Sequence, residues 1–169
     1  MPQDNQALLA RLKTAGLDFV VIGGVCCVYH GVPIATYDLD ICCRFDESSV
    51  RKIDAALRDL HPYHRLTPQR LPFVVTEELL AGLKNLYLET DLGRLDCLGE
   101  VLGVGDYEAA LRNSQLATLS YGTFHFLDLD SLITSKEQAG RDRDLAALRH
   151  LKPIREKLNQ QSKHPSKPK

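Results

Sequence analysis

The sequence has no apolar run that approaches the roughly 20 residues needed to cross a bilayer. It also lacks a positively charged start followed by an apolar stretch, the pattern of a secretory signal peptide. The chain is therefore expected to be cytoplasmic, with no membrane partner. Its 21 Lys and Arg residues are balanced by 22 Asp and Glu residues. This balance excludes a protein whose affinity for nucleic acid depends on phosphate neutralisation alone.

Several metal-binding and catalytic patterns are absent too. No C-x-x-C spacing occurs among the five cysteines, which argues against a zinc site. The odd number of cysteines and the adjacent pairs Cys26-Cys27 and Cys42-Cys43 do not suit a disulfide framework. We therefore expect the cysteines to be free and to act as small, buried hydrophobic residues. The sequence contains neither a Walker A phosphate loop nor a Gly-x-Ser-x-Gly turn, so it offers no sign of a P-loop ATPase or a serine hydrolase.

The pattern of apolar residues predicts a single domain over residues 1–158 that mixes helices and strands, followed by a disordered polar tail at 159–169. Gly140 should end one late helix, and Pro153 should kink or split the next one. The predicted helices cover residues 5–15, 25–30, 49–60, 107–113, 128–139 and 142–158, with a further helix starting at 76–78. The predicted strands cover residues 19–22, 36–45, 73–75, 85–90, 94–99, 116–119 and 123–127.

Three aspartates lie within these strand-like runs. Asp38 and Asp40 are two residues apart, so a strand would project both from one face, after Thr36 and the Gly23-Gly24 turn. Asp96 lies in a later run. Because charged groups in apolar strands are costly unless they are neutralised, the three carboxylates indicate a shared Mg²⁺ ion. The alternative is that they are ordinary turn residues at strand ends, in contact with water.

Four features taken together resemble the minimal nucleotidyltransferases of the DNA polymerase β-like superfamily. They are Gly23-Gly24, the Thr36-x-Asp38-x-Asp40 pattern, the segment ETDLGRLDCLG with Asp96, and the late helix LITSKEQAGRDRDL. They occur in the family's order across residues 17–151 and most resemble the branch that includes the AbiEii-type toxins. The resemblance implies an α+β fold, a mixed sheet flanked by helices with a C-terminal helical segment.

The resemblance also implies an activity, namely transfer of an NMP from an NTP to an acceptor hydroxyl with release of pyrophosphate. Asp38 and Asp40 would bind Mg²⁺ or Mn²⁺, and Asp96 would ligate one ion and help to deprotonate the hydroxyl. The phosphates would lie near Gly23, Gly24 and Thr36. The acceptor stays open among RNA (a tRNA end in particular), a protein side chain and a small molecule.

The late helix adds two basic residues, Lys136 and Arg141, which the resemblance implies would contact the triphosphate. The alternative is a structural ion-pair cluster in which Arg141 binds Asp144, three residues further along the helix.

Two positions depart from the family pattern, because Val25 replaces a serine common in relatives and Ile34 replaces an arginine. They leave open a nucleotide-binding or protein-interaction module with weak catalysis. The chain could also be the toxin half of a pair, with an antitoxin protein as its partner.

Overall fold

A computed structural model describes residues 3–163 of the chain. The chain begins with α1 (Asn5–Thr14), β1 (Phe19–Ile22), α2 (Gly23–Tyr29), β2 (Leu39–Cys43), α3 (Glu47–Leu57) and the short 3₁₀ helix η1 (Arg58–Leu60). It continues with β3 (Tyr63–His64), α4 (Glu77–Gly82), β4 (Asn85–Thr90), β5 (Gly93–Leu98), β6 (Glu100–Val101) and β7 (Gly105–Asp106). It ends with α5 (Tyr107–Arg112), β8 (Ser114–Leu119), β9 (Gly122–Leu127), α6 (Leu129–Ala139) and α7 (Asp142–Lys163).

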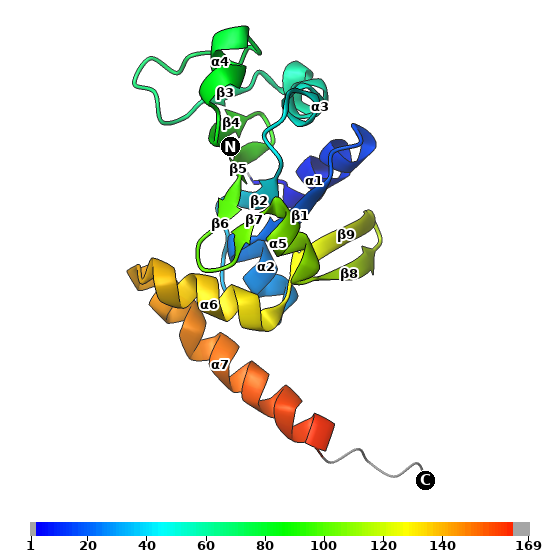
Figure 1. Ribbon diagram of the computed structural model, residues 1–169, viewed down its shortest axis with the longest axis vertical. Coiled ribbons are helices and arrows are strands. Elements are labelled where there is room, and N and C mark those ends of the chain that lie inside the picture. Colours follow the sequence, from blue (N-terminus) through cyan, green and yellow to red (C-terminus); the bar gives the residue numbers. More distant parts are fainter. Residues whose placement is uncertain (1–2, 164–169) are drawn as a thin grey trace.

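Seven strands form one sheet in the order β3-β4-β5-β2-β1-β9-β8. The pairs β2–β5 and β1–β9 are parallel and the other neighbours are antiparallel, so the sheet is mixed. β6 and β7 form a separate two-stranded ribbon. The predicted α+β class, a mixed sheet flanked by helices with a C-terminal helical segment, is confirmed (Figure 1).

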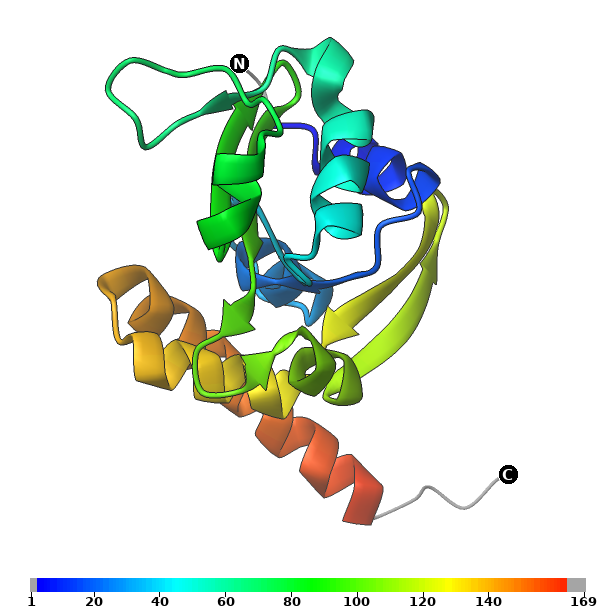
Figure 2. The same ribbon diagram turned by 45° about the horizontal axis from the view of Figure 1, so that its top comes forward.

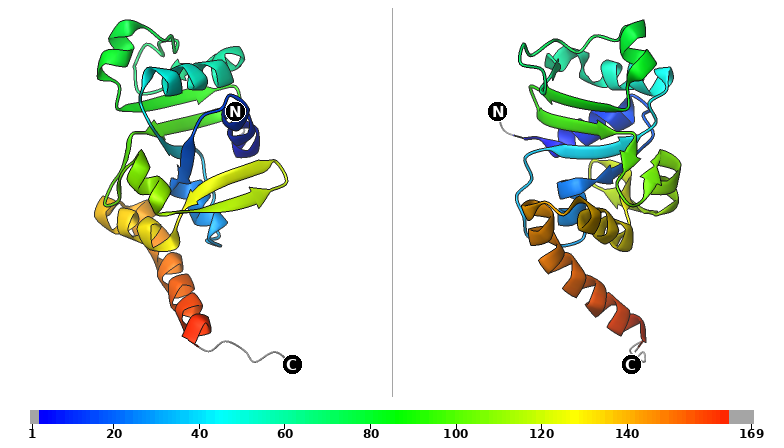
Figure 3. Two further views of the ribbon diagram at one scale, coloured as in Figure 1. Left: turned by 45° about the vertical axis from the view of Figure 1, so that its right-hand side comes forward. Right: turned by 60° about the vertical axis from the view of Figure 1, so that its left-hand side comes forward.

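The helices pack in two groups around the sheet. Helices α1 and α3 lie side by side, whereas α2 contacts β1, β2 and α6 (Figure 2). Helix α6 packs along α7, and the distal part of α7 extends away from the sheet (Figure 3). No helix within residues 3–163 is both long enough and apolar enough to cross a membrane.

The core is built around the central strands. All four residues of β1 are buried, and Asp40 is the only residue of β2 that is not fully buried. The five cysteines are buried and free, as predicted from their spacing. The start of α3 is capped by Asp46, whose carboxylate accepts the Ser49 backbone N–H at 2.7 Å.

Two predicted strands differ clearly from the structure. The predicted strand 36–45 begins only at Leu39, because β1 and β5 pair with β2 no further than this residue. The predicted strand 73–75 is wrong. Tyr63–His64 pairs with β4 instead, while Phe73 donates its backbone N–H to Pro62. Gly140 breaks the helical pattern as predicted, and it ends α6 in a left-handed conformation.

The last helix is longer and more regular than its sequence predicted. Pro153 neither splits it nor ends it, and α7 runs unbroken to Lys163, so residues 159–163 are helical. The rest of the predicted tail, residues 164–169, lies outside the described residues.

Candidate metal and nucleotide site

The three predicted aspartates come together where β2 and β5 run side by side. The parallel pairing places Asp40 directly opposite Asp96. Asp38 lies two residues before Asp40, in the bend that leads into β2. One carboxylate oxygen from each aspartate lies within 4.8 Å of the other two. The cluster thus joins acids that are nearly sixty residues apart in the sequence.

Gly23 is needed where the chain passes from β1 into α2. Its φ is +62°, and Ile22 just before it pairs with Asp40 across the sheet. A Cβ on Gly23 would lie 2.0 Å from Oδ2 of Asp40 and 2.7 Å from its Cβ. Only glycine combines this backbone conformation with so close an approach to the carboxylate.

Gly24 and Thr36 lie together beside this turn. A Cβ on Gly24 would come within 2.8 Å of Cγ2 of Thr36. The Thr36 hydroxyl accepts a 3.2 Å hydrogen bond from the side-chain amide of Asn5. The glycine pair therefore lets α2 approach both Thr36 and the aspartate cluster.

Asp40 is the electrostatic centre of the cluster. Its pKa is raised to about 7, mainly by burial and then by the neighbouring Asp38 and Asp96 carboxylates. A hydrogen bond from the Gly24 backbone and the charge of Lys136 act in the opposite direction without cancelling this increase. Such a group of hard oxygen donors, close together and short of positive charge, fits a divalent cation such as Mg²⁺.

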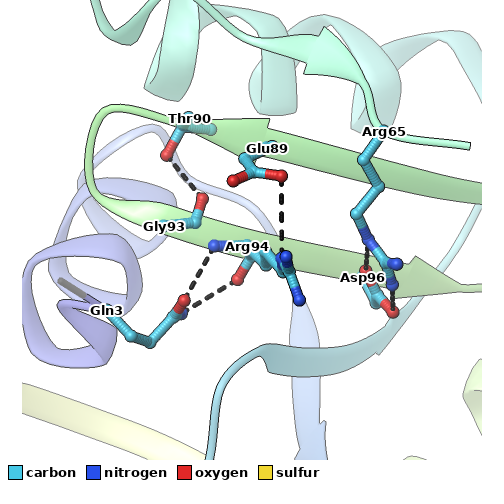
Figure 4. A network of polar contacts seen from close by, with 7 residues as sticks. All are labelled: Gln3, Arg65, Glu89, Thr90, Gly93, Arg94 and Asp96. Carbon is cyan, nitrogen blue, oxygen red and sulfur yellow. Dashed lines mark hydrogen bonds and ion pairs between the residues drawn. The ribbon is translucent and has the colours of Figure 1, made fainter. Parts of the chain in front are cut away.

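Asp96 has a partner that the sequence did not predict. Arg65, just after β3, donates from Nε to Oδ1 of Asp96 at 3.1 Å and from its Nη2 to Oδ2 (Figure 4). Burial raises the pKa of Asp96, and the hydrogen bonds from Arg65 only partly oppose this shift. Arg65 was missed because it lies in a segment predicted to be a loop, where no spacing pattern marks it.

The two predicted phosphate contacts share a different partner. Lys136 Nζ lies 2.8 Å from Oδ1 of Asp144, and Arg141 Nε lies 2.7 Å from Oδ2. Asp144 is fully buried. Burial favours a higher pKa for Asp144, but the hydrogen bonds from Lys136 and Arg141 outweigh it and hold the pKa below its ordinary value. The ion-pair cluster given as an alternative is therefore present.

All these side chains line one cleft of about 820 Å³, a volume within the range of small-molecule sites. Arg65 and Arg143 also line it, as do three exposed side chains, Tyr37, Leu66 and Leu102. The cleft is bordered by every residue that the sequence singled out for metal or phosphate binding: Gly23, Gly24, Thr36, Asp38, Asp40, Asp96, Lys136 and Arg141.

Comparisons with known proteins find similarity to solved structures alone. No protein-family model matches the chain, and no curated protein is significantly similar to it in sequence. Four chains of solved structures match this chain. One of them is the crystal structure of a candidate nucleotidyltransferase from Thermotoga maritima, with 18% sequence identity and a TM-score of 0.49. The match covers 90% of this chain and 89% of that chain. Any function must therefore be argued from this chain's own residues.

Proposed function

We propose that this protein is a nucleotidyltransferase that uses Mg²⁺ or Mn²⁺ to transfer an NMP from an NTP to an acceptor hydroxyl. The observation that carries the proposal is the cluster of three carboxylates, Asp38, Asp40 and Asp96, in a cleft of about 820 Å³. A divalent ion held by such a cluster would stabilise charge on the triphosphate and activate the acceptor oxygen. The resemblance of the ordered sequence motifs supports the same activity.

Each group in the cleft has a role in this proposal. Asp38 and Asp40 hold the ion, and Asp96 accepts the proton of the acceptor hydroxyl. The hydroxyl oxygen bonds to the α-phosphorus, the bond from that phosphorus to the bridging oxygen of the β-phosphate breaks, and pyrophosphate leaves. Gly23, Gly24 and Thr36 line the phosphate end of the site.

Lys136 and Arg141 favour an anionic substrate even though Asp144 binds both. Two cations and one carboxylate leave one positive charge on the cleft wall. This charge suits a polyphosphate, and the buried Asp144 fixes the position of the two basic side chains.

A transfer assay tests the activity. The protein is incubated with one labelled NTP at a time, Mg²⁺, and an RNA, protein or small-molecule acceptor. We expect label transfer by the wild type, and loss of transfer in Asp38→Ala and Asp40→Ala. Asp18→Ala is the matched control, because Asp18 is exposed and lies outside the cleft. Absence of transfer to every acceptor, or transfer that persists in both cluster variants, would refute the proposal.

A second candidate function is metal-dependent nucleotide binding without transfer. The pairing of Arg65 with Asp96 favours it, because a carboxylate that accepts hydrogen bonds from a guanidinium at both oxygens is a weaker base. The departures at Val25 and Ile34 point the same way. Calorimetry of NTP binding with and without Mg²⁺ separates the two functions, since binding without product formation supports the second.

Membership of the AbiEii-type branch would make this chain a toxin with an antitoxin partner. The late segment LITSKEQAGRDRDL, which forms α6 and the start of α7, supports this assignment through its resemblance to that branch. Expression in a bacterial host tests it. Growth arrest that disappears with Asp40→Ala supports a toxin, and harmless overexpression of the active protein opposes one.

A further inference from the structure

Arg65 occupies both carboxylate oxygens of Asp96. The guanidinium donates from two nitrogens, one to each oxygen, in the fork geometry that matches a carboxylate (Figure 4). Asp96 is buried, with its side chain 8% exposed, and the Arg65 side chain is 22% exposed. The pair therefore lies inside the cleft wall and is partly shielded from water, where such a contact is stronger than on an open surface.

Contacts on the neighbouring strand hold Arg65 in this position. Its backbone N–H donates to the carbonyl of Tyr87 at 3.1 Å, and its guanidinium lies 5.5 Å from the centre of the Tyr87 ring. Tyr87 is in turn the register partner of Asp96. Arg65, Tyr87, Asp96 and Asp40 thus follow one another across the sheet from its β3 edge to β2.

The charges of the cluster match this arrangement. Three carboxylates and one guanidinium leave two negative charges, which a single divalent ion balances. Lys136, the other cation that acts on Asp40, is already bound to Asp144. Asp38 and Asp40 have no ion-pair partner within the described part of the chain, so the uncompensated charge is on these two residues.

We propose that Arg65 takes the place of a second cation at Asp96, so that the nucleotide-free protein binds one divalent ion through Asp38 and Asp40. This inference rests on the proposed function. Arg65 is a positioning residue in this arrangement: while it holds both oxygens, its positive charge makes Asp96 a poorer ligand for a further ion and a weaker base. Asp96 gains both abilities when Arg65 moves from at least one of its oxygens.

Titration with Mn²⁺, followed by the electron paramagnetic resonance signal of the free ion, tests the inference on the nucleotide-free protein. We expect one bound ion in the wild type and two in Arg65→Gln. The second ion should bind at least about tenfold more tightly to the variant than to the wild type, because no charge-assisted pair has to be broken first. Adding Asp96→Asn to Arg65→Gln should remove the second ion again.

Arg94→Gln is the matched control. Arg94 lies on β5 with Asp96 and pairs with Glu89 at 3.6 Å, but neither residue lines the cleft (Figure 4). The Arg94→Gln variant should keep one bound ion. Arg65→Lys provides a second variant, because lysine keeps the charge but lacks the fork that engages both oxygens. Its second ion should bind with an affinity between those of the wild type and Arg65→Gln.

The possible outcomes separate this inference from the proposed function. Two tight ions in the wild type, or a single ion in both folded Arg65 variants, would overturn the role of Arg65 and leave the transferase proposal standing. Absence of any Mn²⁺ binding that depends on Asp38 and Asp40 would overturn both. A variant that only lowers the unfolding midpoint and still binds one ion would assign Arg65 a purely structural role.

Discussion

Replacing Gly23 with alanine tests whether the tight passage from β1 into α2 holds Asp40 in place. The new Cβ would lie 2.0 Å from Oδ2, 2.6 Å from Cγ and 2.7 Å from Cβ of Asp40. A rotation of the carboxyl group can relieve the first two contacts. It cannot relieve the third, because Cβ is fixed to the backbone of β2. Therefore α2 and β2 must separate, or Asp40 must leave the cluster.

The expected cost has two parts. Alanine at φ +62° loses roughly 1–2 kcal/mol relative to glycine, and forcing an extra carbon into a packed site adds roughly 1–3 kcal/mol. Gly16→Ala is the control, since Gly16 has a similar φ of +76° with no atom within 4 Å of a Cβ. Gly16→Ala should therefore show only the cost of alanine at a positive φ.

Urea unfolding and Mn²⁺ titration of the two glycine variants give the measurement. We expect Gly16→Ala to lose about 1–2 kcal/mol and to bind Mn²⁺ as the wild type does. Gly23→Ala should lose roughly 2–5 kcal/mol and bind Mn²⁺ more than about tenfold more weakly. Equal losses of stability in the two variants, with equal Mn²⁺ affinity, would refute the packing argument.

Two further predictions concern α7. Asp144→Asn should destabilise the protein by about 3 kcal/mol, because it leaves the largely buried Lys136 without a charged partner. The control is Asp142→Asn. Asp142 is exposed, so this variant should change stability by less than about 0.5 kcal/mol. The pKa of Asp144 is lowered on folding, so its contribution is complete above the unfolded pKa of about 3.9 and disappears as the pH falls through the folded pKa. Urea unfolding from pH 7 to pH 3 should show this difference shrinking only below about pH 4, and a difference that grows with acid would contradict the assignment. Pro153→Ala should restore a hydrogen bond to the Arg149 carbonyl. We therefore expect stability to rise by up to about 3 kcal/mol and the helical circular dichroism signal to increase. A loss of helicity would contradict this.

Local chemistry was enough to predict most of the fold. The apolar run of β1 and the break in the helical pattern at Gly140 each depend on neighbours in the sequence, and each is found as predicted. The errors arose where distant pairing decides the outcome. Tyr63 and His64 form β3 because Glu89 and Leu88 are available on β4, which no local pattern reveals.

The same distinction applies to the candidate site. The parity of Asp38 and Asp40 and the apolar run around Asp96 predicted a shared cluster, and the cluster is present. The β2–β5 register joins only Asp40 and Asp96, whereas Asp38 reaches them from the bend before β2 and not from the predicted strand. Arg65 could not be predicted, because a tertiary contact with Tyr87 fixes its position and the loop itself has no period. For Lys136 and Arg141, the family resemblance implied phosphate binding, and the alternative was an ion pair of Arg141 with Asp144. The structure has that pair and adds Lys136 to it, which the sequence did not predict.

The distribution of charge in the cleft limits where a cation can bind. Asp144 is neutralised by two basic side chains, and Asp96 is neutralised through both of its oxygens. Asp38 and Asp40 remain, with no basic partner within 4.0 Å among residues 3–163. A divalent ion would therefore gain most at these two residues, where no existing ion pair has to be broken. In the proposed reaction Asp96 would act more readily once its pair with Arg65 had loosened, so the strength of this pair would set how readily the proposed site passes from binding to transfer.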